Sequence, residues 1–319
     1  MSIAPRRLTV VRATPDRVED ALSALLAAGP AASARFARQA ESARIPLDRM
    51  WCLADDFGRY RLAVLAVPTL GRTAMLLATH PRSEDEASML AEAISSAADG
   101  CADACDIAQA LVEPSRPLDV AAFEAAGLRR IATLDYLERN LPRAGTLEPT
   151  PVPEGWTVEP VADADVLGAA DPGLLGEARR AQLAALLDAS YRETRDCPGL
   201  AGMRRTSDVL DGHFGPGARP RFWFLARDAH GPHGVCLVNG SPDAQNAELV
   251  YLGLAPEARG KGVAQALLGA ALHACSRARI GIVSLAVDAL NEPARRLYDA
   301  NGFRKASSRV ALVRRLRSA

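Results

Sequence analysis

The order of the predicted structural elements repeats along the chain at a fixed offset. Adding 175 to a residue number aligns Leu77 with Leu252, and the alignment runs without a gap as far as Arg139 and Arg314. Ten aligned pairs are identical, against about five expected by chance in a chain so rich in Ala, Leu and Arg. Identity is a weak signal, but strand, helix, strand, helix and final strand recur at the same lengths, which predicts a duplicated domain. The alternative is a pair of unrelated α/β domains.

The composition is that of a globular protein. A length of 319 residues is sufficient for two domains at roughly 100–200 residues each. Apolar residues make up 49% and charged residues 24%, which excludes a disordered or collagen-like chain. The 38 basic residues balance the 38 acidic ones, so we expect no nucleic-acid partner.

No segment of the sequence suggests a membrane protein. The longest stretch without Asp, Glu, Lys or Arg covers 262–276, too short to cross a bilayer core of about 30 Å as a helix. The first residues contain no apolar signal segment, so we expect a cytoplasmic protein without a membrane partner.

A proline-rich stretch near the middle predicts the domain boundary. Four prolines and two glycines lie between Leu141 and Trp156, without helical or strand periodicity. We therefore expect a first domain over 1–143, a linker over 144–153 and a second domain over 154–319. Strand-like runs alternate with amphipathic helical patterns on both sides, which predicts an α/β fold with a mixed sheet.

The most informative run begins at Leu252. A strand is expected to end at Leu254, Pro256 stops its ladder, and the glycines that follow open a helix. The first amides of a helix have no acceptor within it, and together with the positive end of the helix dipole they suit a pyrophosphate. Gly260 and Gly262 would let phosphates approach the backbone closely. The alternative is a glycine-rich turn without a ligand.

Two other kinds of site are disfavoured. Gly260 and Gly262 are not followed by the third glycine of the dinucleotide-binding fingerprint. Cys101 and Cys105 could form half of a metal site, but no second Cys/His pair stands nearby in the sequence. We therefore expect no metal.

The run Arg259-x-x-Gly262-x-Ala264 resembles the Arg/Gln-x-x-Gly-x-Gly/Ala signature of the GCN5-related N-acetyltransferase (GNAT) family. This short signature is loose, but the preceding strand, the apolar helix after it and the downstream run from Asn291 to Phe303 also match the family pattern. The resemblance implies acetyl-CoA as co-substrate. It also implies two tandem acetyltransferase-like domains, each a mixed, mostly antiparallel sheet flanked by helices.

The resemblance also assigns residues to the CoA site. In the family the turn holds the pyrophosphate, the strand before it pairs with the pantetheine amides, and an asparagine after the next strand contacts the pantetheine arm. The matching residues are Leu252, Gly253, Leu254, Arg259, Gly260, Lys261, Gly262, Val263, Ala264 and Asn291. Asn291 would also cap a helix well, and the two roles are compatible.

Two residues are candidates for the chemistry. Tyr298 stands where the resemblance places the acid that protonates the departing thiolate, although it could equally be a core aromatic. Glu248 stands where several family members place a base that acts directly or through water. The period of a strand puts Glu248, Val250, Leu252 and Leu254 on one face. The alternative for Glu248 is a solvated strand start.

The N-terminal repeat has lost these features. Phe123 replaces Tyr298 and Thr73 replaces Glu248 at the same offset. The positions of the phosphate turn hold Glu84, Asp85, Glu86 and Ala87. Like charges would repel a pyrophosphate there. We therefore expect a degenerate domain without a CoA site.

The resemblance implies an acyltransferase that moves an acetyl group from acetyl-CoA to a primary amine of a small molecule, directly and in a ternary complex. The alternative is a non-catalytic acyl-CoA-binding or sensor protein. We expect a monomer or homodimer, and the sequence does not identify the acceptor. Family members build the acceptor pocket in the region that here holds Tyr191, Glu193, Asp196, Asp211 and His213.

Overall fold

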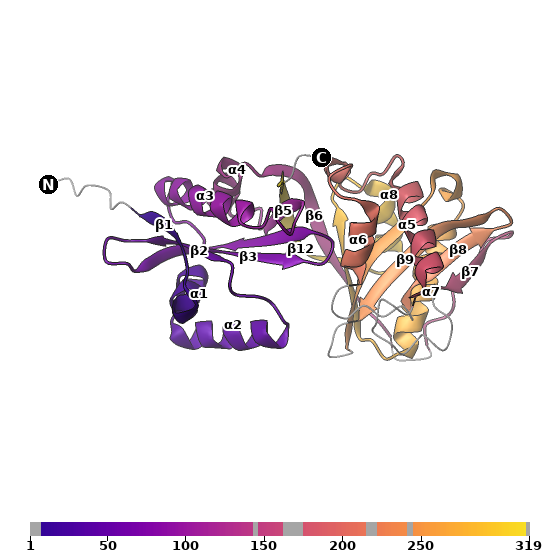
Figure 1. Ribbon diagram of the computed structural model, residues 1–319. Coiled ribbons are helices and arrows are strands. Elements are labelled where there is room, and N and C mark those ends of the chain that lie inside the picture. The colour runs from indigo at the N-terminus through magenta and orange to yellow at the C-terminus, as the bar shows by residue number, and fades with distance from the viewer. Residues whose placement is uncertain (1–7, 143–145, 162–174, 215–221, 241–244, 317–319) are drawn as a thin grey trace. The chain divides into compact units, whose positions relative to one another are not determined.

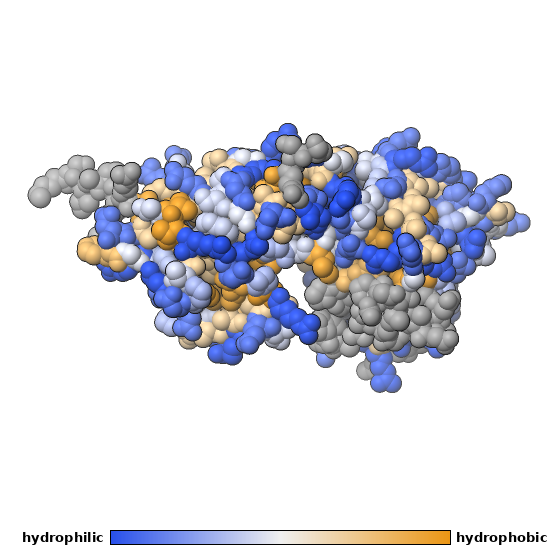
Figure 2. Space-filling model, viewed as in Figure 1, coloured by the Kyte–Doolittle hydropathy of each residue, from blue (hydrophilic) through white to orange (hydrophobic). Residues whose placement is uncertain are grey.

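The computed structural model describes residues 8–142, 146–161, 175–214, 222–240 and 245–316 (Figure 1). Its contacts divide the chain into an N-terminal unit, Met1–Ala132 with Arg309–Ala319, and a C-terminal unit, Thr133–Ser308. Each unit is a mixed sheet flanked by helices, so the predicted α/β class is confirmed. Hydrophilic residues are spread over the visible face of both units (Figure 2).

The sheet of the N-terminal unit runs in the order β1-β2-β3-β4-β5-β12. Its strands are β1 (Thr9–Arg12), β2 (Met50–Ala54), β3 (Tyr60–Thr69), β4 (Thr73–Ala78), β5 (Ile107–Val112) and the end of β12 (Arg304–Arg315). Its helices are α1 (Val18–Leu26), α2 (Pro30–Ser42), α3 (Glu84–Asp99) and α4 (Pro117–Ala125). Only β4 and β5 pair in parallel among these neighbours. Figure 1 shows α3 and α4 on one side of this sheet and α1 and α2 on the other.

The sheet of the C-terminal unit runs in the order β6-β11-β10-β9-β8-β7. Its strands are β6 (Arg129–Asn140), β7 (Thr157–Pro160), β8 (Phe224–Asp228), β9 (Gly231–Gly240), β10 (Asn246–Leu254) and β11 (Ile282–Asp288). Its helices are α5 (Glu177–Tyr191), α6 (Thr206–His213), α7 (Val263–Arg277) and α8 (Glu292–Ala300). Helices α5 and α6 share one buried cluster with Trp223 and Leu237, whereas α7 and α8 share another with Leu249 and Val283. The two clusters lie on opposite faces of the sheet, because alternate residues of a strand point to opposite faces.

The last strand of each repeat belongs to the sheet of the other unit. Residues Leu134 to Asn140 of β6 pair with β11, and Val310 to Arg315 of β12 pair with β5. The units therefore part after residue 132 and again after residue 308. This differs from the expected domains, 1–143 and 154–319, at both of their C-terminal ends.

The proline-rich stretch is part of the C-terminal unit and not a free linker. Its residues 146–153 lie along α7, where the imidazole Nδ1 of His273 donates to the carbonyl oxygen of Leu147 at 2.8 Å. A Cβ added at Gly269 would come within 1.9 Å of Thr150 Oγ1, so the glycine allows the close approach. Part of the expected linker, 143–145, lies outside the described residues.

The offset of 175 residues holds for the last three elements of each repeat. Shifted by this number, β5, α4 and β6 begin where β11, α8 and β12 begin, at Ile282, Glu292 and Arg304. The repeated order of elements therefore reports a duplicated fold, as the sequence pattern predicted.

Candidate functional site

The parallel strands β10 and β11 separate about halfway along their length. Asn246 to Leu249 pair with Ile282 to Leu285. After Leu249, the pairs of β10 that the structure describes are with β9. Strand β11 stays paired with β6 as far as Asp288. The edge of β10 that faces β11 is therefore open after Leu249. An extended chain with amide groups can pair with such an edge as an added strand.

A β-bulge lies where the two strands separate. The register between β10 and β9 shifts between Leu249 and Tyr251. Leu249 and Leu252 both pack in the α7/α8 cluster, whereas Val250 and Tyr251 pack in the α5/α6 cluster. The expectation that Glu248, Val250, Leu252 and Leu254 share one face is therefore wrong, because a bulge inserts one residue into the alternation.

The turn between β10 and α7 presents an open backbone. Gly260 and Gly262 have φ of +72° and +78°, values that a glycine adopts without the strain of a Cβ. Nothing lies within 4 Å of a Cβ built at Gly260. Gly262 gives α7 no side-chain cap, and the first turn of the helix has no acidic residue. These backbone N–H groups and the helix dipole fit the pyrophosphate of a nucleotide such as CoA.

Arg259 stabilises the turn through backbone carbonyls. Its guanidinium donates to the carbonyl oxygens of Leu254, Ser190, Arg192 and Glu193, at 2.7 to 3.3 Å. These bonds tie the end of β10 to the C-terminal end of α5. Because they use most of its N–H donors, we infer that Arg259 positions the turn rather than binding a phosphate itself.

Lys261 and Trp156 lie beside the same turn. The ammonium of Lys261 is 6.0 Å from the ring centroid of Trp156. Pro153 is also near, 3.4 Å from a Cβ built at Gly262. The proline-rich stretch thus reaches the mouth of the candidate anion site.

The N-terminal unit has no corresponding turn. Helix α3 begins at Glu84, the position equivalent to Arg259, so residues aligned with the glycine turn form a helical turn instead. Ser83 Oγ accepts a hydrogen bond from the amide of Glu86, and the Glu86 carboxylate accepts one from the amide of Arg82 at 2.8 Å. These two bonds fix an acidic first turn of α3 in place of an open glycine turn.

Tyr298 is buried between α8 and the sheet. Its side chain is 6% exposed, and its ring meets Phe303 edge to face with centroids 5.7 Å apart. Burial raises the pKa of the Tyr298 hydroxyl, and the nearby Cys236 and Asp196 act in the same direction. The phenol therefore stays protonated at neutral pH, as a proton donor requires.

Asn291 has the capping role and a second one. Its Oδ1 accepts from the amide of Ala294 at the start of α8, and its side chain also bonds to Asp196. The amide of Asp288 donates to Asp196 at 3.1 Å, and the amide of Cys197 donates to Asp288 at 3.2 Å. These bonds fasten the loop after α5 to the end of β11, beside the open edge of β10.

The opposite face holds a polar and aromatic cluster. Tyr251 Oη and Ser190 Oγ are 2.5 Å apart, and the rings of Tyr191 and His213 lie 6.0 and 5.6 Å from that of Tyr251. Burial lowers the pKa of His213 to about 4, so its imidazole is neutral. Its Nε2 is buried and has no hydrogen-bond partner in the described part of the chain.

Glu248 lies on the face of this cluster. Its neighbours Ala247 and Leu249 are buried in the α7/α8 cluster, so strand alternation directs the carboxylate to the other side. Glu248 reaches solvent, but the protein around its carboxyl group raises its pKa by desolvation. Glu248 therefore titrates closer to neutrality than an ordinary glutamate.

Two further residues, Asp211 and Glu193, were expected near an acceptor. Asp211 forms an ion pair with Arg180, and Glu193 is exposed. Sequence reasoning missed Ser190 and Tyr251, which contact each other across α5 and β10. The sequence offered one signal for Tyr251. It follows Glu248 by three residues, and the bulge brings both residues to the same face of the sheet.

Comparison with known proteins finds a family model that matches part of the chain. The model, described as "Acetyltransferase (GNAT) family", matches residues 187–303, which include the turn and Tyr298. This segment of the C-terminal unit is similar to GNAT acetyltransferases. A relative, mycothiol acetyltransferase of Beutenbergia cavernae, is 30% identical over 188 residues, which cover 56% of this chain and 58% of that protein. The match thus spans a little over half of that relative.

Solved structures share the tandem fold over the whole chain. A GCN5-related N-acetyltransferase from Sphaerobacter thermophilus is 17% identical with a TM-score of 0.62, covering 99% of this chain and 98% of that one. A tandem GNAT protein from the clavulanic acid biosynthesis pathway is 19% identical with a TM-score of 0.55, covering 98% and 99%. At these identities the likeness concerns the fold alone.

The described residues include neither a metal-binding cluster nor a membrane-spanning helix. No group of three or more His, Cys, Asp or Glu side chains among them is arranged to hold a metal ion. None of the helices described is both long and apolar enough to cross a membrane.

Proposed function

We propose that the C-terminal unit transfers an acetyl group from acetyl-CoA to the primary amine of a small molecule, by direct transfer in a ternary complex. The observation that carries this proposal is the combination of an open strand edge on β10 with an uncapped glycine turn at α7. The edge suits the pantetheine amides and the turn suits the pyrophosphate, and the two are contiguous along the chain.

The groups that would bind CoA are mainly backbone groups. Leu252, Gly253 and Leu254 offer the strand edge, and Gly260 to Ala264 offer the amides of the turn. Lys261 adds a positive charge, and Asn291, which lies at the start of α8 and bonds to Asp196, would contact the pantetheine arm. A site of this kind uses little side-chain chemistry, so it tolerates variation around the glycines.

The proposed reaction needs one base and one acid. Glu248 accepts a proton from the ammonium group of the acceptor, directly or through water. The neutral amine nitrogen then forms a bond to the thioester carbonyl carbon, and the carbon–sulfur bond breaks. Tyr298 gives its proton to the departing thiolate, and the second proton of the attacking nitrogen passes through water to the resulting phenolate. The products are an amide and free CoA.

A direct assay tests the function. Purified protein with acetyl-CoA is expected to release free thiol when a matching amine is added from a panel of amino acids, amino sugars and polyamines. Release must scale with the amount of acetylated product. Tight CoA binding without thiol release for any amine would favour the acyl-CoA sensor instead.

One CoA should bind per chain. The N-terminal unit places Glu84, Asp85 and Glu86 in a capped helical turn where the C-terminal unit has its glycines. Like charges oppose a pyrophosphate there. Calorimetric titration with CoA is expected to give a stoichiometry close to one, and two equivalent sites would contradict the inference.

Glu248 should set the acidic limb of the pH profile. A base works in its ionised form, so kcat/KM is expected to fall as pH drops through the raised pKa of Glu248. Glu248→Gln should remove this limb and reduce kcat/KM by on the order of 10²-fold or more. Glu159→Gln, an exposed glutamate on β7, is the matched control and should keep the limb. An unchanged limb in the Glu248 variant would exclude it as the base.

A further inference from the structure

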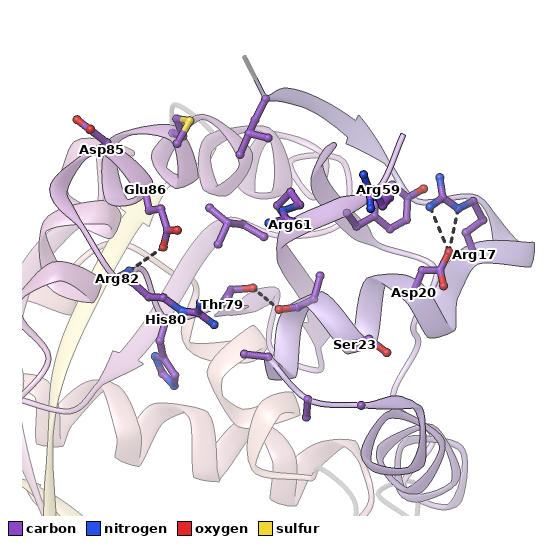
Figure 3. A pocket seen from close by; sticks show the side chains of 18 of the residues that line it. Arg17, Asp20, Ser23, Arg59, Arg61, Thr79, His80, Arg82, Asp85 and Glu86 are labelled. Carbon is purple, nitrogen blue, oxygen red and sulfur yellow. Dashed lines mark hydrogen bonds and ion pairs between the residues drawn. The ribbon is translucent and has the colours of Figure 1, made fainter. Parts of the chain in front are cut away.

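The N-terminal unit contains a cavity of about 1030 Å³ that the proposed activity does not use. It lies between the C-terminal end of α1, the start of β3 and the turn from β4 into α3 (Figure 3). Pockets for small molecules are commonly about 300–1,000 Å³. The space is therefore sufficient for a ligand of that class.

Arginines dominate the charges of this cavity. The basic side chains that line it are Arg17, Arg59, Arg61, Arg82 and His80, and the acidic ones are Asp20, Asp85 and Glu86. Figure 3 shows Arg61 and Arg82 on two different walls, one on β3 and one on the turn before α3. A ligand between these walls could meet both guanidinium groups.

Most of these charges already have partners within the unit. Arg17 donates to Asp20 at 3.1 Å and stacks on the ring of Tyr60 at 4.0 Å. Arg59 forms an ion pair with Asp55 at 3.5 Å. His80 is paired with Asp119, outside the cavity.

The side chains of Arg61 and Arg82 differ from the others. Neither has a hydrogen bond or an ion pair within the described ranges, although the backbone amide of Arg82 donates to Glu86. Two guanidinium groups without a hydrogen-bonded carboxylate thus border one cavity, although Arg61 is close enough to Asp55 to act on its charge. A planar guanidinium prefers a carboxylate or phosphate, with which it forms two parallel hydrogen bonds.

Two carboxylates at the start of α3, those of Asp85 and Glu86, also line the cavity. Glu86 accepts a hydrogen bond from the amide of Arg82, and Figure 3 shows Asp85 turned away from Arg61 and Arg82. The carbonyl oxygen of Ala24 at the end of α1 accepts from Thr79 Oγ1 at 2.9 Å and from the amide of Ala27. The carbonyls of that helix end are thus partly satisfied and repel an anion less.

We propose that this cavity binds a small anion through Arg61 and Arg82, with a carboxylate or a phosphate as the recognised group. The site is separate from the CoA site, because it lies in the other unit and uses arginine side chains instead of helix amides. A degenerate domain that has lost its glycine turn would thus keep a binding role of its own.

Inorganic phosphate is a suitable first probe, provided that the turn at α7 does not compete for it. Titration is therefore done on the full chain carrying Gly262→Glu, which puts a carboxylate in that turn. Calorimetry is expected to show one phosphate per chain. Succinate, tested in parallel, reports whether a carboxylate is bound instead.

Paired variants localise the binding. The double variant Arg61→Gln with Arg82→Gln is expected to lower the affinity for the anion at least tenfold. The control is Arg35→Gln with Arg38→Gln, two exposed arginines of α2 outside the cavity lining, which removes the same charge and should leave affinity unchanged. Thermal unfolding of all variants confirms that they fold.

Three results would overturn the proposal. They are no binding of either anion to the parent, equal affinity after the Arg61 and Arg82 changes, and equal weakening by both pairs, which would indicate only diffuse surface charge. Because Gly262 is already changed, none of these results depends on acetyl transfer. Failure of the proposed function would appear separately, as CoA binding that the Gly262 change does not affect.

Discussion

Gly262→Glu is expected to weaken CoA binding by on the order of 10²–10³-fold while the C-terminal unit remains folded. The new carboxylate would sit at the N-cap of α7, where the pyrophosphate is proposed to bind. Two like charges about 4 Å apart repel by about 4 kcal/mol at the effective dielectric constant of a protein surface. Each 1.4 kcal/mol of that repulsion is tenfold in affinity.

Gly262→Ala separates charge from backbone strain. Gly262 has φ of +78°, so any side chain is strained there, and a Cβ would lie 3.4 Å from Pro153. Alanine shares that strain and that contact but carries no charge, so its loss of affinity should be several-fold only. Calorimetry with CoA measures both variants. Equal losses of CoA affinity in the two variants would mean that backbone geometry, and not charge, determines binding at this turn. Unchanged affinity in both variants would show that the turn is not part of the CoA site.

The sequence predicted the repeated elements well because their signals are local. Helix α8 begins at Glu292 after the capping residue Asn291, followed by Pro293, a favoured residue in a first helical turn. The equivalent helix α4 begins at Pro117 and has the same length. Caps, prolines and apolar periodicity act over a few residues, so one chain is sufficient to read them.

The separation of β10 from β11 could not be read in this way. It begins at a bulge around Val250, between Leu249 and Tyr251, all three of which are good strand formers. No glycine marks the bulge. The shift is a property of how three strands pair, and it reverses the faces that simple alternation gave to Leu252 and Leu254.

The exchange of final strands was also hidden in the sequence. Strands β6 and β12 each span twelve residues, and either could complete the sheet of its own repeat. Which neighbour a strand pairs with depends on tertiary contacts of β5 and β11. The expected domain ends followed the order of the sequence and therefore missed the exchange.

Arg259 shows that a motif can be recognised from the sequence without revealing the role of each of its residues. The resemblance assigned Arg259 to the CoA site as part of the turn whose amides would hold the pyrophosphate. The structure gives four carbonyl oxygens to that guanidinium, three of them from the end of α5. An Arg259→Ala change should thus loosen the turn and the α5 end together, because these carbonyls would lose their donor.

The largest kinetic effect is expected from Tyr298→Phe. Phenylalanine keeps the edge-to-face packing on Phe303 but has no proton to give to the thiolate. A positioned general acid commonly contributes 10²–10⁴-fold, so kcat should fall by on the order of that factor. The KM for acetyl-CoA should change little, because binding rests on backbone groups that this change does not touch.

Tyr251→Phe is the matched control for this prediction. Tyr251 also carries a buried hydroxyl whose pKa is raised by burial, and Asp196 influences both tyrosines. Its hydroxyl is engaged with Ser190 on the face that carries Glu248, so its removal should act on the acceptor side and lower kcat far less than Tyr298→Phe does. Steady-state kinetics from pH 6 to 10 compare the two variants. A large loss in Tyr251→Phe with a normal rate in Tyr298→Phe would exchange their roles. Normal rates in both would assign the proton to water and leave Tyr298 as a packing residue.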